Sequence, residues 1–253
     1  MFHFSLSHVV LWSALVVTTI AGAQAQDNDD TDDGASRLSV GLILGVPITG
    51  SAEGVASSIN TSETDPPSVT NTVVDSAGFP FVAGGAVRYD VGERFGVGLD
   101  LTYRRGGYDS VINIAEQVTD DDDGDLILNT FTETRSHFWD VPILGRYYLS
   151  DRSSDGPRFF ATGGAAVRFV TGLNSQTEVT DDDNVTDTDT TAIGPANDAV
   201  LGAVLGFGMR ASDDVGVKVD IEFRYTRWLN PIFQSGPANS NSNQADVMVS
   251  LTF

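Results

Sequence analysis

Apolar and polar residues alternate with a period of two along eight separate stretches of this chain, which is the pattern of β-strands with one apolar face. The stretches cover residues 38–48, 79–90, 94–105, 134–149, 158–171, 199–211, 215–228 and 244–253. In the seventh stretch, Val219, Ile221 and Phe223 alternate with Asp220 and Glu222. The pattern predicts an all-β fold with eight strands.

The connections between these stretches alternate strictly between long and short. The short ones surround Gly92 and cover residues 150–157 and 212–214, and the long, polar ones cover residues 49–78, 106–133, 172–198 and 229–243. An up-and-down antiparallel barrel places all short connections at one end and all long ones at the other. We therefore expect an eight-stranded antiparallel up-and-down β-barrel with both termini at the short-turn end.

The distribution of charge between the two strand faces indicates what surrounds the barrel. A soluble barrel of the lipocalin kind lines its cavity with apolar residues and turns its charges to water. Here one face carries large apolar and aromatic side chains, and the other mixes glycine with charges of both signs, which is typical of a transmembrane barrel. The aromatic residues predicted to form girdles at the two membrane interfaces are Phe79, Tyr89, Tyr103, Trp139, Tyr147, Phe159, Phe169, Tyr225 and Phe253.

The same parity places charged residues in the lumen of the barrel. The predicted lumen residues are Arg88, Asp100, Arg104, Asp140, Arg146, Arg168, Arg210, Lys218, Asp220, Glu222, Arg224 and Asp246. One interpretation is a structural ion-pair network that plugs the barrel, because buried charges must be paired. The alternative is a narrow, anion-leaning pore or a proton path.

The first 25 residues predict an export signal. An apolar run over residues 9–20 precedes Ala23-Gln24-Ala25, an A-x-A cleavage site. Residues 26–36 then form a short acidic segment, expected in the periplasm, and residues 37–253 form the barrel. No apolar stretch reaches the roughly 18 residues that a transmembrane helix needs.

The last strand ends on an aromatic residue. Residues 243–253 alternate between an apolar and a polar face and finish with Phe253. Such an ending resembles the signal that barrel-assembly machinery reads, so we expect that machinery and outer-membrane lipid as partners. Removal of Phe253 is expected to slow assembly more than it weakens the finished barrel.

Composition adds a strong acidity. The formal net charge is −21 and cysteine is absent. A surface this acidic repels nucleic acid and is also typical of proteins from salty habitats. The absence of cysteine means that no disulfide can form. Much of the charge lies in acidic runs at residues 26–34, 119–125 and 179–190. We expect these runs to be solvated low-complexity sequence, with weak Ca²⁺ or Mg²⁺ binding as the alternative.

An enzyme is the competing functional class, and hydrolytic chemistry usually recruits a histidine. Two of the three histidines lie in the predicted export signal, and parity places His137 on the outer wall beside Trp139. Asp220 and Glu222 alternate with basic residues and are expected to be ion-pair partners. We therefore predict no catalytic residue and no cofactor.

Four segments resemble one family of membrane proteins. They are FWDVPILGRYYL at 138–149, PRFFATGGAAVRF at 157–169, GAVLGFGMR at 202–210 and VKVDIEFRYTRWL at 217–229. These segments resemble the PorT-like outer-membrane β-barrel domain family. The resemblance implies an outer-membrane barrel of a Gram-negative bacterium, but the acidic loops depart from the family, so a secretion-accessory role is not expected. We predict a structural or surface-interaction barrel, with an ion-conducting pore as the alternative.

Overall fold

The computed structural model describes residues 37–50, 52–54, 59–62, 68–76, 81–116, 126–151, 156–181, 184–192, 196–213, 216–232, 234–235 and 238–253. The predicted export signal and the acidic segment at 26–36 lie outside the described residues, as do Phe79 and the acidic run at 119–125. No helix among the described residues is long and apolar enough to cross a membrane.

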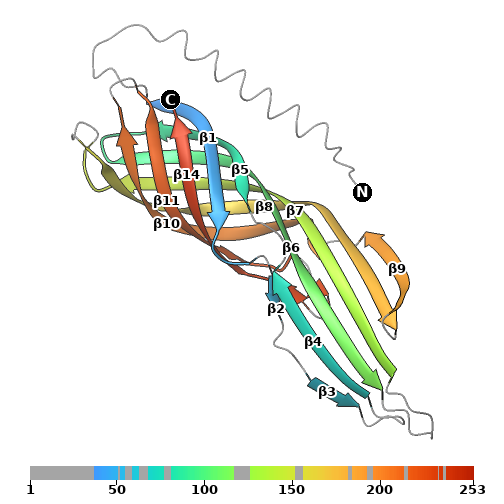
Figure 1. Cartoon of the computed structure of the whole chain (residues 1–253). Coiled ribbons are helices and arrows are strands. Elements are labelled where there is room, and N and C mark those ends of the chain that lie inside the picture. The colour runs from blue at the N-terminus through green and yellow to red at the C-terminus, as the bar shows by residue number, and fades with distance from the viewer. Residues whose placement is uncertain are drawn as a thin grey trace, which may run out of the picture. The chain divides into compact units, whose positions relative to one another are not determined.

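Eight antiparallel strands close into a ring, which confirms the predicted barrel (Figure 1). The strands are β1 (Leu38–Pro47), β5 (Val82–Asp90), β6 (Phe95–Glu116), β7 (Leu126–Tyr148), β8 (Arg158–Asp181), β10 (Ala199–Ser212), β11 (Lys218–Trp228) and β14 (Asn243–Thr252). Each pairs with the next in this order, and β14 pairs with β1. All eight strands therefore have two hydrogen-bonded neighbours.

The closing pair brings the two ends of the barrel sequence together. Val40 and Phe253 exchange two backbone hydrogen bonds, of 3.0 and 3.1 Å. The short connections lie at this same end. In the β10–β11 turn, Asp213 accepts from Val217 N–H through its side chain, and Gly216 adopts a φ of 89°, which glycine reaches without a Cβ clash.

Three strands continue well past the barrel at the other end. Figure 1 shows β6, β7 and β8 running outward beside β4 (Ser68–Ser76) and β9 (Asn184–Ala192). β4 pairs with β6, β3 (Ile59–Ser62) pairs with β4, and β9 pairs with β8. β2 (Ala52–Gly54), β13 (Ala238–Ser240) and β12 (Gln234–Ser235) form a separate small sheet.

The predicted strand ends at 105, 134 and 171 were therefore wrong, and residues 179–181 and 184–190 of the predicted connection lie in β8 and β9. The extensions are rich in Thr, Val and Ile, which favour strands. The apolar–polar alternation is less regular there than along the barrel. Strands predicted from alternation therefore end where the barrel ends, and the extensions are missed.

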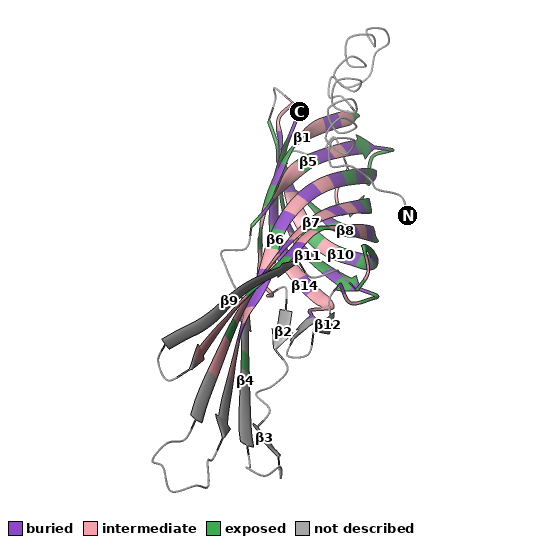
Figure 2. Cartoon of the chain, turned by 90° about the vertical axis from the view of Figure 1, so that its right-hand side faces the viewer, coloured by how far each residue is buried: buried purple, intermediate pink, exposed green. Residues whose placement is uncertain are grey.

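Buried and exposed residues alternate along the barrel strands (Figure 2). On β1, for example, Leu42 is 66% exposed and the adjacent Ile43 is 1% exposed. The apolar side chains thus form the outer wall, as predicted for a barrel in lipid.

Aromatic residues mark both ends of this apolar wall. Phe81, directly before β5, and Tyr89 on β5 face outward and lie eight residues apart, as do Phe95 and Tyr103 on β6. Eight residues in a strand tilted by about 40° rise roughly 20 Å along the barrel axis. That rise approaches the apolar band of about 25 Å that outer-membrane barrels present to lipid.

Glycine inside the wall is needed where a lumen side chain lies against the strand. A Cβ on Gly98 would lie 3.0 Å from Nη1 of Arg88 and 3.1 Å from its Cδ, whereas on Gly85 the nearest atom is 3.8 Å away. Gly98→Val should push Arg88 off Asp100 and lower the free energy of unfolding by roughly 1–3 kcal/mol.

Gly85→Val is the matched control, because Gly85 faces outward and has room. Urea unfolding of the two refolded variants in lipid vesicles checks the difference. Equal losses for both variants would contradict the close packing of Arg88 on Gly98.

Candidate functional site

The lumen is the part of the barrel where chemistry-bearing side chains gather. All twelve predicted lumen residues are buried inside the ring, and Asp90 and Arg158 join them. Six acidic and eight basic side chains therefore share this interior. Buried charges of this number require specific partners, because each unpaired ion costs several kcal/mol of desolvation.

A continuous chain of ion pairs begins at Arg88, which contacts Asp100 directly. Asp100 also accepts from Arg224 at 2.9 Å, and Arg224 reaches Glu222 at 3.1 Å. Glu222 accepts in turn from Arg146 at 2.6 Å. These five residues come from four strands, so the chain of pairs crosses the lumen from wall to wall.

The same chain continues toward the short-turn end. Arg146 donates to Asp220 at 2.5 Å, and Asp220 also binds Arg210 through two hydrogen bonds of 2.6 and 3.0 Å. Arg210 lies 3.5 Å from Asp90, which lies 3.8 Å from Lys218. Three carboxylates, Asp100, Asp220 and Glu222, each bind two arginines through charge-assisted hydrogen bonds, which are stronger than neutral ones.

A second cluster lies nearer the long-connection end. Asp140 binds Arg168 through two hydrogen bonds of 2.6 and 2.7 Å and Arg104 at 3.3 Å. Arg104 forms a bidentate pair with Asp246, both hydrogen bonds being 2.9 Å. Gln244 connects the two halves, since it accepts from Arg168 and donates to Asp246, each at 2.6 Å.

A small cavity separates the two clusters. Its lining includes Arg104 and Asp246 of the outer cluster and Arg224 of the longer chain of pairs. The cavity measures about 20 Å³, which is room for about one water molecule.

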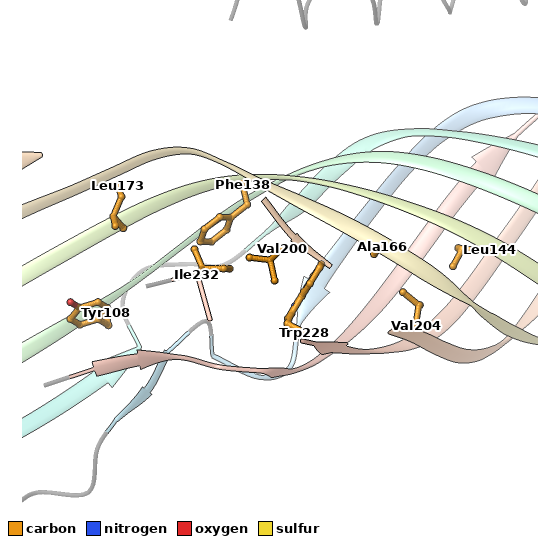
Figure 3. Packing of buried hydrophobic residues seen from close by; sticks show 9 residues of the cluster. All are labelled: Tyr108, Phe138, Leu144, Ala166, Leu173, Val200, Val204, Trp228 and Ile232. Atoms are coloured by element: carbon orange, nitrogen blue, oxygen red, sulfur yellow. The ribbon is translucent and has the colours of Figure 1, made fainter. Parts of the chain in front are cut away.

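An apolar cluster extends from the level of the inner ion pairs past the outer ones toward the long connections. Figure 3 shows its members, which are Tyr108, Phe138, Leu144, Ala166, Leu173, Val200, Val204, Trp228 and Ile232. Arg168 joins this cluster to the charges, because its guanidinium lies 4.1 Å from the Trp228 ring centroid and 4.9 Å from that of Phe138. Such stacking stabilises a cation away from water.

Ile232 comes from the connection between β11 and β14, which folds inward. The Ile232 N–H donates to Ser240 Oγ at 2.8 Å, and its carbonyl accepts from Ala196 N–H at 2.8 Å. Asn197 Nδ2 donates to the Pro231 carbonyl at 2.8 Å. Two long connections are thereby joined over the apolar cluster.

Sequence reasoning missed Asp90, Arg158 and the apolar cluster. Both charged residues lie at strand ends next to short turns, and continued parity from Arg88 and Arg168 would have placed them inward. Ile232 lies in a connection predicted to be polar throughout. The Pro231-Ile232 pair was the one local indication of a packed segment there.

The remaining predicted features lie elsewhere. His137 is on the outer wall, where its Nδ1 hydrogen-bonds the Tyr103 hydroxyl. Among the described residues, no group of three or more Asp, Glu, His or Cys side chains is placed to hold a metal ion. The possible Ca²⁺ or Mg²⁺ site at 119–125 lies outside the described residues and stays a prediction.

Comparisons with known proteins address the family. A family model described as outer membrane protein beta-barrel domain matches residues 23–234. A search of curated proteins finds no match. Ail, the attachment invasion locus protein of Yersinia pestis, is 9% identical with a TM-score of 0.33, over 85% of this chain and 94% of that chain. The translocator domain of autotransporter NalP from Neisseria meningitidis is 10% identical with a TM-score of 0.27, over 98% and 99%.

The carboxylates that each bind two arginines offer a test of the ion-pair network. Asp220→Asn removes the charge that faces Arg146 and Arg210 and should lower the free energy of unfolding by roughly 3–5 kcal/mol. Urea unfolding of the refolded barrel in lipid vesicles measures this loss.

The control is Asp151→Asn in the β7–β8 turn. Arg94 hydrogen-bonds Asp151 there and holds the pKa of that carboxyl below its ordinary value, but both side chains are about half exposed. Water screens such a pair, so its loss should change stability little. Equal destabilisation by both variants would contradict the view that burial makes the Asp220 ion pairs more important for stability than the exposed Arg94–Asp151 pair.

Proposed function

Because the chain belongs to the outer membrane protein beta-barrel domain family, it is an outer-membrane β-barrel, and we propose that its barrel is closed to transport and presents the long connections at the cell surface. The observation that carries this proposal is the ion-pair chain from Arg88 to Lys218, which fills the lumen together with the cluster around Asp140. The apolar cluster around Trp228 and Ile232 adds a second barrier. The barrel acts as a rigid anchor.

Orientation follows from the lengths of the connections. Outer-membrane barrels have short periplasmic turns and long external loops. The β3–β4–β6–β7–β8–β9 sheet then stands outside the cell, and both ends of the barrel sequence lie in the periplasm. The PorT-like resemblance of residues 138–229 supports the same placement.

The external sheet is the surface that we assign to interaction with partners. β3 and β9 each pair with one strand among the described residues, so their other edges offer backbone hydrogen-bonding groups. The role is one of contact and not of catalysis. His137 faces outward beside Tyr103, and the lumen carboxylates are bound by arginines, which leaves no base positioned for a reaction in the described site.

The orientation can be tested by labelling, because the chain has no cysteine of its own. Single-cysteine variants Asp122→Cys, in the β6–β7 connection, and Asp213→Cys, in the β10–β11 turn, are exposed on intact cells to a membrane-impermeant maleimide. Asp122→Cys should react and Asp213→Cys should react only after lysis. Reaction of Asp213→Cys alone on intact cells would invert the orientation.

A narrow pore is the second candidate. The lumen holds more basic than acidic side chains, and a cavity of about 20 Å³ lies between its two clusters. A pore would use these features to pass small anions.

The two candidates predict different effects of Glu222→Gln. In a plugged barrel, this change leaves Arg146 and Arg224 short of one charge and should cost roughly 3–5 kcal/mol of stability, with negligible conductance before and after. In a water-filled pore, solvent screens the change, so stability stays level and anion selectivity rises. Thermal unfolding and single-channel recording of the refolded barrel decide between them. A stable variant with altered selectivity would overturn the plug.

A further inference from the structure

The outer wall of the barrel carries few charged side chains, in contrast to the lumen. Along the barrel part of the eight strands, the described outward-facing positions carry no Asp or Glu. Their only arginines are Arg105 and Arg227, at the long-connection rim. In a chain of net charge −21, this rim is positively charged where the wall meets the lipid headgroups.

The first arginine belongs to an ordered cluster on β6 and β7. Tyr103 hydrogen-bonds Nδ1 of His137, and the backbone register pairs His137 directly with Arg105. The Phe81 and Trp139 rings pack against Tyr103, with centroids 6.4 and 5.4 Å away. The aromatic girdle therefore holds a tyrosine hydroxyl and an imidazole beside an exposed guanidinium.

The second arginine has the same arrangement on β11 and β14. Tyr225 donates from its hydroxyl to Oδ1 of Asn243 at 2.6 Å, and Arg227 donates to the same oxygen at 2.5 Å. The register pairs Asn243 directly with Arg227. Both clusters thus consist of a Tyr-x-Arg sequence on an outward-running strand and a hydrogen-bonding side chain on its neighbour.

The chemistry of both clusters indicates an anionic partner. Arg105 and Arg227 have no acidic partner among the described residues, in contrast to Arg135, which lies further out and pairs with Asp109 and Glu133. A cation held at the edge of the hydrocarbon is costly without a counter-charge. At the level of an aromatic girdle, the abundant counter-charges are the phosphate groups of lipids.

We propose that Tyr103–Arg105–His137 and Tyr225–Arg227–Asn243 are two clamps for the headgroup phosphate of anionic lipids in the outer leaflet. The arginine supplies the charge. Asn243 holds Arg227 by a hydrogen bond, and Arg105 lies across from His137 in the backbone register. This inference rests on the proposed orientation for the choice of leaflet, but the binding itself does not depend on it.

Trp139 allows the first clamp to be measured directly, because it lies against Tyr103 while Trp228 is buried in the lumen. The full chain carrying Trp12→Phe is reconstituted into phosphatidylcholine vesicles that contain brominated phosphatidylglycerol or brominated phosphatidylcholine. Quenching of Trp139 fluorescence gives the relative affinity of the two lipids. We expect a preference of about fivefold for phosphatidylglycerol, the effect of one surface arginine.

Arg105→Gln should abolish this preference, and Arg227→Gln should leave it unchanged. A second reporter, Ala245→Trp in a Trp139→Phe background, lies in register with Tyr225 and should give the reverse result. The matched control, Arg135→Gln, should change neither reading, because Arg135 already has carboxylate partners.

Equal quenching by both lipids in the unsubstituted barrel, or a preference that survives Arg105→Gln, would overturn the first clamp. The same outcomes at the Ala245→Trp reporter, with Arg227→Gln, would overturn the second. Both lipids are present in both leaflets of these vesicles, so a wrong orientation appears only in the maleimide labelling. A failure of the clamps is therefore distinguishable from a failure of the proposed function.

Discussion

Each backbone N–H and C=O inside a bilayer needs a partner within the protein, because hydrocarbon offers none. The pairing of β1 with β14 meets this requirement by removing the last two free strand edges of the barrel. Once the ring is closed, every strand residue must face either lipid or lumen. The separation of apolar and charged side chains follows from that one constraint.

The lumen then sets a problem of charge, since fourteen ionisable side chains lose most of their water. The structure solves it with carboxylates that each serve two arginines, as Asp140 and Asp220 do. Removing one such carboxylate leaves two buried arginines without that partner. The stability of the barrel is therefore expected to be far more sensitive to such a change than to the loss of a surface ion pair. The closed lumen that we propose rests on the same network.

The outside of the barrel shows the complementary arrangement. The described residues of the barrel wall include no acidic side chain, Arg105 and Arg227 lie at the long-connection rim, and aromatic side chains lie near both ends of the wall. Beyond the rim, β6, β7 and β8 continue their backbone hydrogen bonding into an extended sheet. The molecule thus combines a closed ring of eight strands with a sheet in which three of those strands continue beyond the ring.

The sequence by itself determined the number and order of the barrel strands and the face on which Arg88, Asp140 or Glu222 lies, because side-chain direction in a strand has a local period of two. Only the tertiary structure decided the partners: Arg104 binds Asp246, which is 142 residues away, through a register set by closure of the whole ring. The strand extensions and the inward position of Ile232 could likewise not be predicted from the sequence. In the extensions, a strand need not alternate between apolar and polar residues, so the pattern does not reveal it. How a connection packs depends on residues of other strands at the end of the barrel, which are distant in the sequence.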